Sequence, residues 1–442
     1  MTSNSKMSNS KIWKGLRLFF VVWGATLGFS SPGGAAPVLS LEDCLVIAEA
    51  NHPNIAGAAA QVAAQRARLA QSVAADRLEV SGSVAASRSG TDYDESASYS
   101  IGATTSIKVF DSNRNKYRVD SQRSTLSATE EEGRSTFLDV RTNVKSSYMT
   151  LSLNMEIANQ RLESVKAFEH HLEQAKGFYQ VGSKPWYDVT KAEVDLGNAQ
   201  LTLVEAESNI ETAKASLLNA MGIDQKEEFD IVPVSSDILS APQKVGESEF
   251  LTSLATLAPL ALDSRPDYRA SALKILASQA ALSAEARAAS PNVSLTGGYN
   301  SGGDDIFDLE TGWNVGLRMS VPIVDGGAAK AGIDIARGQL ASLAASQEKL
   351  RQDIMLEVRK ALSDLTKARE RIRISELTLV SAEENRKMAM GRYETGVGDP
   401  LEVTDALLSF ADAQLANRQA QYDLQLALIG LEKAVGKEFA KD

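Results

Sequence analysis

Two residue types with reactive side chains are scarce in this 442-residue chain, and each shortage excludes a class of protein. The one cysteine, Cys44, leaves no internal disulfide. It follows Leu41-Glu42-Asp43, which is not a lipoprotein cleavage box, so we predict no lipid anchor and a buried, apolar thiol. With only three histidines and no pairing of a nucleophile with a base, the sequence predicts that the protein is not an enzyme and has no cofactor or metal site.

Long apolar runs are also scarce, because the only one spans Leu18 to Phe29 and is shorter than the roughly 20 residues of a transmembrane helix. Basic residues precede this run and small residues follow it, which is the order of a secretory signal peptide. The basic residues are Lys6, Lys11, Lys14 and Arg17. We predict that residues 1–36 are this signal, with an N-terminal membrane anchor as the alternative. Removing these four basic residues changes the formal charge from −11 to −15, which argues against a nucleic-acid partner.

What the chain does contain is one long unit written twice. The stretch Tyr179 to Gly222 aligns with Tyr393 to Gly436 without a gap, at a shift of 214 residues (396 − 182). A repeat of this length indicates a duplicated half of a domain rather than a short solenoid unit. The sequence therefore divides into a first repeat, residues 37–222; an inter-repeat equatorial segment, residues 223–264; a second repeat, residues 265–437; and a short tail, residues 438–442.

Each repeat contains a pair of segments in which apolar and polar residues alternate. We predict strands at residues 78–88 and 98–110 in the first repeat, and at 291–300 and 311–324 in the second. Segments of about ten residues with one apolar face are typical of transmembrane barrel strands, although a single strand of this kind also fits a water-soluble sandwich. Tyr99, Tyr299 and Trp313 lie near the loop ends, where we expect an aromatic girdle.

After each strand pair, apolar residues recur at steps of three and four, which predicts very long coiled-coil helices. We expect helices at residues 112–180 and 326–394, each followed by a Gly/Pro-bearing tip, and return helices at 187–221 and 401–435. At 1.5 Å per residue the long helices are on the order of 100 Å in length. They therefore project far beyond a bilayer core of about 30 Å.

The equatorial segment is richer in Pro, Ser and Glu than the repeats. It contains a short extended piece, Asp230 to Val234, and a predicted helix near Ser248 to Leu260. We interpret it as an insertion packed beside the helices, with a flexible linker as the alternative.

Four strands cannot close a barrel, and lipid tolerates no open sheet edge. Two copies of the chain would supply eight strands around a filled interior, and three would supply twelve around an aqueous lumen. Lys108 and Arg318 lie on the polar strand faces and suggest a wet interior, which favours three copies over two.

The duplicated order of helix, strand pair, long helix, tip and return helix resembles the TolC family of outer-membrane factors. The most specific residues form the tips: Tyr179-x-x-Gly182-x5-Asp188-Val189-x2-Ala192 and its second copy Tyr393-x-x-Gly396-x5-Glu402-Val403-x2-Ala406. The helix starts Pro53 and Pro266 also match, and the resemblance covers about residues 39 to 437.

The resemblance implies a mainly α fold with membrane β-structure, assembled as a homotrimer. A 12-stranded β-barrel in the outer-membrane lipid would continue into an α-helical barrel in the periplasm. The family works with a periplasmic adaptor and an inner-membrane pump, ABC-type or proton-driven, and the energy comes from that partner. The sequence itself has no Walker-type phosphate loop.

The resemblance also assigns roles to residues at the tips. Glu402 and Asp405 match acidic positions that constrict the periplasmic entrance, and Asp188 matches an acidic tip position in the first repeat. Two tripeptides match the adaptor-docking tips: Val181, Gly182 and Ser183, and Thr395, Gly396 and Val397. Some relatives close the entrance through a basic residue shortly after the second tip glycine, whereas this chain has Gly398. Lys184 and Lys191 are close to Asp188 in sequence and are candidate partners for it.

Several alternatives remain open at this stage. Acidic residues crowd one strand-connecting loop, where either a solvated loop or a cation site is conceivable: Asp304, Asp305, Asp308 and Glu310. A non-conducting coiled-coil envelope protein is the alternative to an export channel. Small-molecule efflux and type I protein secretion are both open as the cargo class, and the missing lipoprotein box leans slightly against acylated efflux factors.

Overall fold

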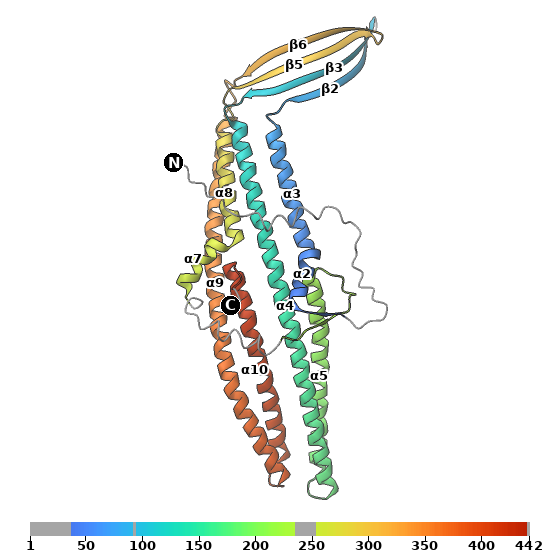
Figure 1. Cartoon of the computed structure of the whole chain (residues 1–442), viewed down its shortest axis with the longest axis vertical. Coiled ribbons are helices and arrows are strands. Elements are labelled where there is room, and N and C mark those ends of the chain that lie inside the picture. Colours follow the sequence, from blue (N-terminus) through green and yellow to red (C-terminus); the bar gives the residue numbers. More distant parts are fainter. Residues whose placement is uncertain (1–36, 92–93, 235–252, 440–442) are drawn as a thin grey trace.

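The protein is a long helical rod with a β-sheet at one end and two helix tips at the other (Figure 1). The computed structural model describes residues 37–91, 94–234 and 253–439. The predicted signal peptide, part of the predicted equatorial helix and the last three residues of the tail lie outside these ranges. Within them, no helix is both long and apolar enough to span a membrane.

Helices make up most of the described chain. They are α2 (Leu41–Asn51), α3 (Pro53–Ala74), α4 (Arg114–Gln180), α5 (Trp186–Met221), α7 (Leu254–Ser264), α8 (Pro266–Glu285), α9 (Ala328–Glu394) and α10 (Pro400–Val435). The strands are β1 (Val38–Leu39), β2 (Glu79–Thr91), β3 (Asp94–Phe110), β4 (Asp230–Ile231), β5 (Asn292–Asp305) and β6 (Asp308–Ser320).

The two repeats match almost residue for residue. Helices α4 and α9 each have 67 residues and start 214 positions apart, and α5 and α10 each have 36 residues at the same offset. Before the strand loops the offset between the two repeats is 213 residues (266 − 53), as the helix starts Pro53 and Pro266 show. The length difference between the repeats therefore lies within the two β-hairpins.

A glycine ends each return helix where another helix begins. Gly222 and Gly436 both adopt a left-handed backbone, with φ of 72° and 73°. A Cβ on Gly222 would lie 2.8 Å from the Cα of His52, and one on Gly436 would lie 2.7 Å from the Cγ of Arg265. The start of α3 therefore abuts the end of α5, and the start of α8 abuts the end of α10. Only glycine fits both the backbone conformation and the space at these two positions.

The sheet curves away from the rod in the order β2-β3-β5-β6, with antiparallel neighbours (Figure 1). Its register places Gly82 opposite Ala103, Ala103 opposite Tyr299, and Tyr299 opposite Trp313. Residues that lie opposite one another share a face, so the apolar positions of all four strands form one continuous surface. Its large side chains are solvent-exposed in the single chain: Val80, Val84, Ile101, Leu295, Tyr299, Trp313, Val315, Leu317 and Met319.

The strand ends differ from the ranges 78–88, 98–110, 291–300 and 311–324. The hairpins reach further because polar residues continue the ladder where the sequence favoured a loop. Ser87 and Ser98 hydroxyls lie 3.3 Å apart across β2 and β3, and those of Ser89 and Ser96 lie 3.0 Å apart. Strand β6 stops at Ser320 rather than residue 324 because Pro322 has no N–H to donate.

The long helices begin two residues later than the ranges 112–180 and 326–394 predict. The two residues before each helix adopt a left-handed backbone, which turns the chain from sheet to helix. Their φ values are 58° at Ser112, 64° at Asn113, 64° at Gly326 and 92° at Gly327. Return helices α5 and α10 begin one residue earlier than predicted, at Trp186 and Pro400.

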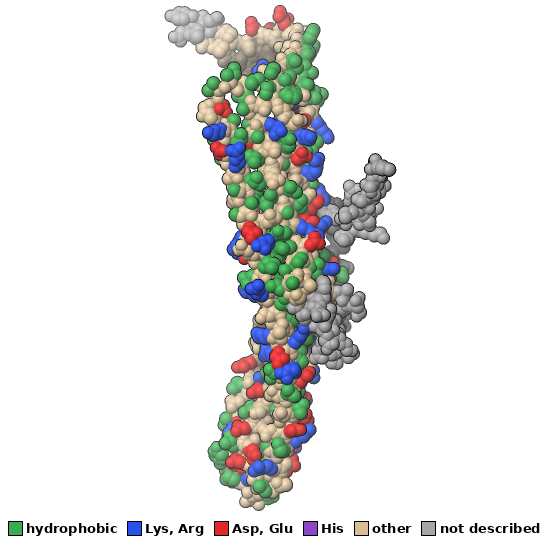
Figure 2. Space-filling view, turned by 90° about the vertical axis from the view of Figure 1, so that its left-hand side faces the viewer, with side chains coloured by type: hydrophobic (Ala, Val, Ile, Leu, Met, Phe, Trp, Pro, Cys, Tyr) green, Lys and Arg blue, Asp and Glu red, His purple; other side chains and the backbone are tan. Residues whose placement is uncertain are grey.

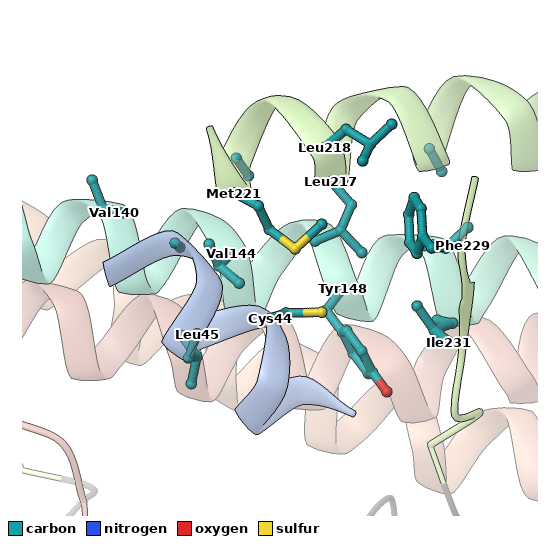
Figure 3. Packing of buried hydrophobic residues seen from close by; sticks show 14 residues of the cluster. Cys44, Leu45, Val140, Val144, Tyr148, Leu217, Leu218, Met221, Phe229 and Ile231 are labelled. Atoms are coloured by element: carbon teal, nitrogen blue, oxygen red, sulfur yellow. The ribbon is translucent and has the colours of Figure 1, made fainter. Parts of the chain in front are cut away.

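The largest core lies midway along the rod, where α2, α4, α5 and β4 meet (Figure 3). Cys44 lies in this core with no exposed surface, and burial raises the pKa of its thiol to about 12, so the predicted buried role is confirmed. The hydroxyl of Tyr148 donates to the carbonyl oxygen of Val232 at 2.6 Å, which holds the equatorial segment against α4. Strand β4 also pairs in parallel with β1, so the segment packs beside the helices at this point.

Candidate functional site at the helix tips

The tips of the α4–α5 and α9–α10 hairpins have the same backbone. Gly182 and Gly396 have φ of 73° and 80°. The amide of Gly182 donates to the carbonyl of Tyr179 at 2.9 Å, and that of Gly396 donates to the carbonyl of Tyr393 at 3.0 Å. Each tip is a helix end closed by a left-handed glycine.

A hydrogen bond joins the two tips. Nζ of Lys184, on the first tip, donates to the carbonyl oxygen of Gly398, on the second, at 2.9 Å. Gly398 has no room for a side chain, because an added Cβ would lie 2.7 Å from the backbone nitrogen of Tyr393. Gly398 therefore supplies a backbone acceptor to a lysine from the other repeat.

Tyr393 is the central side chain of the junction between the hairpins. It is 1% exposed. Its ring lies 5.4 Å from that of His171 and 5.3 Å from that of Phe178, both on α4, and the Lys184 ammonium lies 5.3 Å from its centroid. A second-repeat tyrosine thus packs into the first hairpin.

Three buried polar atoms at this junction have no hydrogen-bond partner within the described residues: Nδ1 of His171, Oδ2 of Asp188 and the hydroxyl of Tyr393. Burial lowers the pKa of His171, and it raises the pKa of Tyr393 to about 12. Buried polar groups usually have a hydrogen-bond partner, and leaving one without a partner costs free energy. The three unpaired atoms therefore indicate that this junction is packed at some energetic cost.

Asp188 is buried rather than presented at the surface, with 3% of the residue exposed. Burial raises the pKa of its carboxyl, nearby Lys184 opposes this rise, and Asp399 reinforces it. Lys191, the other candidate partner, instead pairs with Asp195. Asp195 is itself buried and accepts a hydrogen bond from the Thr404 hydroxyl at 3.0 Å, which is a second link between the repeats.

Glu402 and Asp405 lie on the first turns of α10, three residues apart and therefore on one side of the helix. Glu402 is half-buried and faces Arg392, with 3.6 Å between the carboxylate and guanidinium groups. Asp405 is exposed. Both carboxylates are therefore accessible, unlike that of Asp188.

The predicted docking residues are exposed at both tips. Val181 is 76% exposed and Val397 is 75% exposed. Gly182, Ser183, Thr395 and Gly396 are exposed as well. The first tip also carries an aromatic pair that sequence reasoning missed, because the rings of Tyr179 and Trp186 meet edge to face with 5.0 Å between their centroids.

The predicted girdle residues share the apolar face of the sheet but lie at two levels. Tyr299 and Trp313 are directly paired, and Tyr99 lies opposite Gly303, four residues nearer the hairpin ends. Within the described residues, no group of three or more His, Cys, Asp or Glu side chains is placed to hold a metal ion.

Helices far longer than a bilayer is thick, topped by a sheet with one apolar and one polar face, are the features of a membrane-anchored protein of the cell envelope. The family model described as outer membrane efflux protein matches residues 45–223 and 257–437. The chain belongs to this family of TolC-like outer-membrane factors. It is therefore an outer-membrane protein with a helical periplasmic part, and the family consists of channels that work with an adaptor and an inner-membrane pump.

Individual relatives agree with this assignment. Cation efflux system protein CusC of Escherichia coli K12 is 25% identical over 338 residues, which cover 74% of this chain and 70% of CusC. Outer membrane efflux protein BepC of Brucella suis is 23% identical over 351 residues, covering 78% and 74%. Outer membrane protein OprJ of Pseudomonas aeruginosa is 29% identical over 179 residues, covering 40% of this chain and 37% of OprJ.

Solved structures show the same fold. A crystal structure of CusC has a TM-score of 0.81 at 21% identity and covers 92% of this chain and 96% of that one. The open state of the Neisseria gonorrhoeae MtrE outer membrane channel has a TM-score of 0.74 at 18% identity, covering 90% and 89%.

Proposed function

We propose that three copies of this chain form a channel-tunnel that carries solutes across the periplasm and the outer membrane. The observation that carries this proposal is the sheet: in the described chain β2 and β6 each pair on one side only. Because lipid tolerates no unpaired edge, the edges must pair between copies. Three copies supply twelve strands (3 × 4), and the polar face with Lys108 and Arg318 would line an aqueous lumen.

The helices support closure by the same operation. Along the tip half of the rod the row is α9, α10, α4, α5, so α9 and α5 are its outer members (Figure 1). Both carry exposed apolar residues at coiled-coil spacing: Val194, Leu201 and Val204 on α5, and Ile374, Leu377 and Met388 on α9. Packing α5 of one copy on α9 of the next is a head-to-tail contact that closes into a ring. The barrel of strands would then continue into a barrel of helices.

Glu402 and Asp405 are the proposed acidic constriction of the periplasmic entrance. Threefold symmetry would bring six of these accessible carboxylates together, and crowded negative charges favour cations. Asp188 is the third acidic residue of the proposed constriction and is buried within the first tip.

The exposed tips are the proposed docking surface for a periplasmic adaptor bound to an inner-membrane pump. This proposal rests on the exposure of Val181, Gly182 and Ser183 and of Thr395, Gly396 and Val397. At the opposite end of the rod, Tyr99, Tyr299 and Trp313 are the proposed aromatic girdle in the lipid.

The cargo we propose is a small solute rather than a secreted protein. The relatives support this choice by name, since CusC belongs to a cation efflux system and BepC is an efflux protein. A strain lacking the gene should become more sensitive to toxic ions or drugs and should secrete its proteins normally. Loss of one secreted protein with unchanged sensitivity would instead favour type I secretion.

The channel function is tested by planar-bilayer conductance of the purified protein. We expect the wild type to carry a small cation-selective current and Glu402→Ala/Asp405→Ala to carry a larger, less selective one. Glu205→Ala/Glu207→Ala is the matched control, because it removes two exposed carboxylates from α5 about 25 Å above the tips.

Selectivity unchanged in the Glu402→Ala/Asp405→Ala variant would place the gate elsewhere. Inserted trimers of both proteins with no current at any voltage would contradict the export function and favour a non-conducting coiled-coil envelope protein.

A further inference from the structure

Two lysines lie where helix electrostatics disfavours them. The first turn of α2, α5, α8 and α10 contains at least one acidic residue, as the positive end of a helix dipole favours. The first turns of α3, α4, α7 and α9 contain none. In α4 and α9 the third residue is instead a lysine, Lys116 and Lys330, at equivalent positions of the two repeats. Helix stability does not account for a basic residue kept twice at this place.

Acidic side chains nearby are engaged elsewhere. The Asp111 carboxylate accepts the backbone amide of Asn115 at 2.7 Å, and the Asp325 carboxylate accepts that of Ala329 at 2.8 Å. Glu285 pairs with Arg114 and Arg118, at 3.3 and 3.8 Å. Lys116 and Lys330 are both exposed, and neither makes an ion pair with any residue that the structure describes.

The contacts of α4 show which way Lys116 points. Arg114 and Arg118 reach Glu285 at the end of α8, while Asn115 and Gln122 bond to α3. Successive helical residues differ in direction by about 100°, so position 116 lies on the side of α4 that faces neither neighbour.

The lysines also lie at a defined level of the molecule. The apolar face of β6 runs from Trp313 to Met319, about 20 Å along the strand, and the exposed residues Val321 and Ile323 follow it just past the strand end. A lipid-facing band is roughly 25 Å tall. Ile323 and Val324, at the inner rim, are 92% and 88% exposed. Lys330 follows within one turn of α9.

The same arrangement is visible on the surface of the molecule. Figure 2 shows hydrophobic side chains gathered at the end that carries the sheet, with Lys and Arg side chains first gathering just below them. Because the helices extend into the periplasm, this rim lies at the periplasmic leaflet of the outer membrane.

We propose that Lys116 and Lys330 bind the phosphate groups of anionic phospholipids in the periplasmic leaflet and so fix the depth of the sheet in the membrane. The adjoining rim residues Phe110, Ile323 and Val324 contact the acyl chains of the same lipids. A lysine suits this role because its long apolar stem lies along the lipid boundary while its ammonium reaches the headgroup. Because the chain as a whole is negatively charged, the two lysines at the rim form a local site of opposite charge.

The test titrates detergent-solubilised full-length protein with dioleoylphosphatidylglycerol and, separately, dioleoylphosphatidylcholine, and counts bound lipid by native mass spectrometry. We expect the wild type to prefer phosphatidylglycerol. Lys116→Gln and Lys330→Gln should each weaken its apparent affinity about fivefold and leave phosphatidylcholine binding unchanged. Lys116→Arg/Lys330→Arg should retain the preference, because the charge is kept.

The matched control is Lys360→Gln/Lys367→Gln, which removes two exposed lysines of α9 roughly 50 Å away from the rim. An equal loss of phosphatidylglycerol binding in this control would reduce the effect to net charge and overturn the proposal. So would wild-type affinity in Lys116→Gln/Lys330→Gln. If inorganic phosphate at the same phosphate concentration displaces the lipid fully, the site binds simple anions and the assignment to phospholipid is wrong.

Discussion

The two helix tips have one backbone and two different chemistries. Gly182 and Gly396 close them in the same left-handed conformation. The aligned tyrosines then diverge, because Tyr179 is 45% exposed and packs edge to face against Trp186, whereas Tyr393 is 1% exposed and packs into the other repeat. The aligned acids diverge in the opposite sense, with Asp188 buried and Glu402 accessible.

This contrast shows that both copies kept the same turn after the duplication, whereas the side chains around the turn diverged. The turn depends on a glycine and on backbone hydrogen bonds, so both copies must keep it. The side chains around it became divided between two tasks. Lys184, Asp195 and His171 of the first repeat contact the second, while Glu402 and Asp405 of the second repeat remain available at the surface.

The strongest test of this contrast between the tips is to truncate the two aligned tyrosines, Tyr393 and Tyr179. We expect Tyr393→Ala to cost the junction about 3–5 kcal/mol, because it empties a buried ring site. Tyr179→Ala, the matched control, should cost about 1 kcal/mol, since it loses one exposed aromatic pair. Amide hydrogen exchange of the tip peptides measures both, and the first variant should exchange at least about a hundredfold faster. Similar effects of the two changes would show that the junction does not depend on Tyr393.

The sequence alone predicted the duplication because periodicity survives divergence. Long helices and their return partners follow from apolar residues repeated at three- and four-residue steps, and their ends fall within two residues of the predicted ones. The strand ends were predicted less well. Serines such as Ser89 and Ser96 suit either a loop or a ladder, and only pairing decides between them.

The junction between the tips could not be predicted from local pattern. Lys184 and Gly398 are 214 residues apart, and the acceptor is a backbone carbonyl that any residue would supply. Burial of Asp188 was equally hidden, since an acid in the first turn of a helix is usually exposed. One signal was available: the second repeat has Gly398 where the first has Lys184, which indicates that this position of the second tip has no room for a side chain.

A smaller effect is expected from the bond that joins the tips. Lys184→Met keeps the stem and removes the ammonium that donates to Gly398, so it should weaken the junction by about 1 kcal/mol. Lys176→Met is the matched control, because Lys176 pairs within its own hairpin with Glu193 at 3.8 Å and aligns with Met390 of the second repeat. Faster amide exchange at Gly398 in the first variant alone is the expected result. Equal exchange in both variants would mean that the bond adds nothing to the junction.

The last expected effect depends on pH and concerns His171, which aligns with the exposed Asn385 of the second repeat. Burial lowers the pKa of His171 from its ordinary value of 6.5, His170 and Lys191 act in the same direction, and Asp195 opposes them. The packed junction therefore binds fewer protons than the separated one. Its stability falls as the pH drops below about 6.5, by at most about 1.4 kcal/mol per pH unit.

Asp188 acts with the opposite sign. Its pKa is raised above 3.8, so the packed junction favours the protonated carboxyl and regains stability as the pH falls through that raised value. The two groups oppose each other, because the histidine effect begins near pH 6.5 as the pH falls and the carboxyl effect is complete near 3.8. We expect the junction to loosen just below pH 6.5, where His171 begins to take up its proton.

His171→Asn, which copies the second repeat, should abolish that loosening, and His170→Asn on the exposed side of the same helix should preserve it. Tip-peptide exchange at pH 7.5 and 5.5, corrected with the same peptides unfolded, measures the difference. Loosening that persists in His171→Asn would assign it to another group of the junction. Its disappearance would show that one buried imidazole makes the first hairpin pH-sensitive where its copy is not.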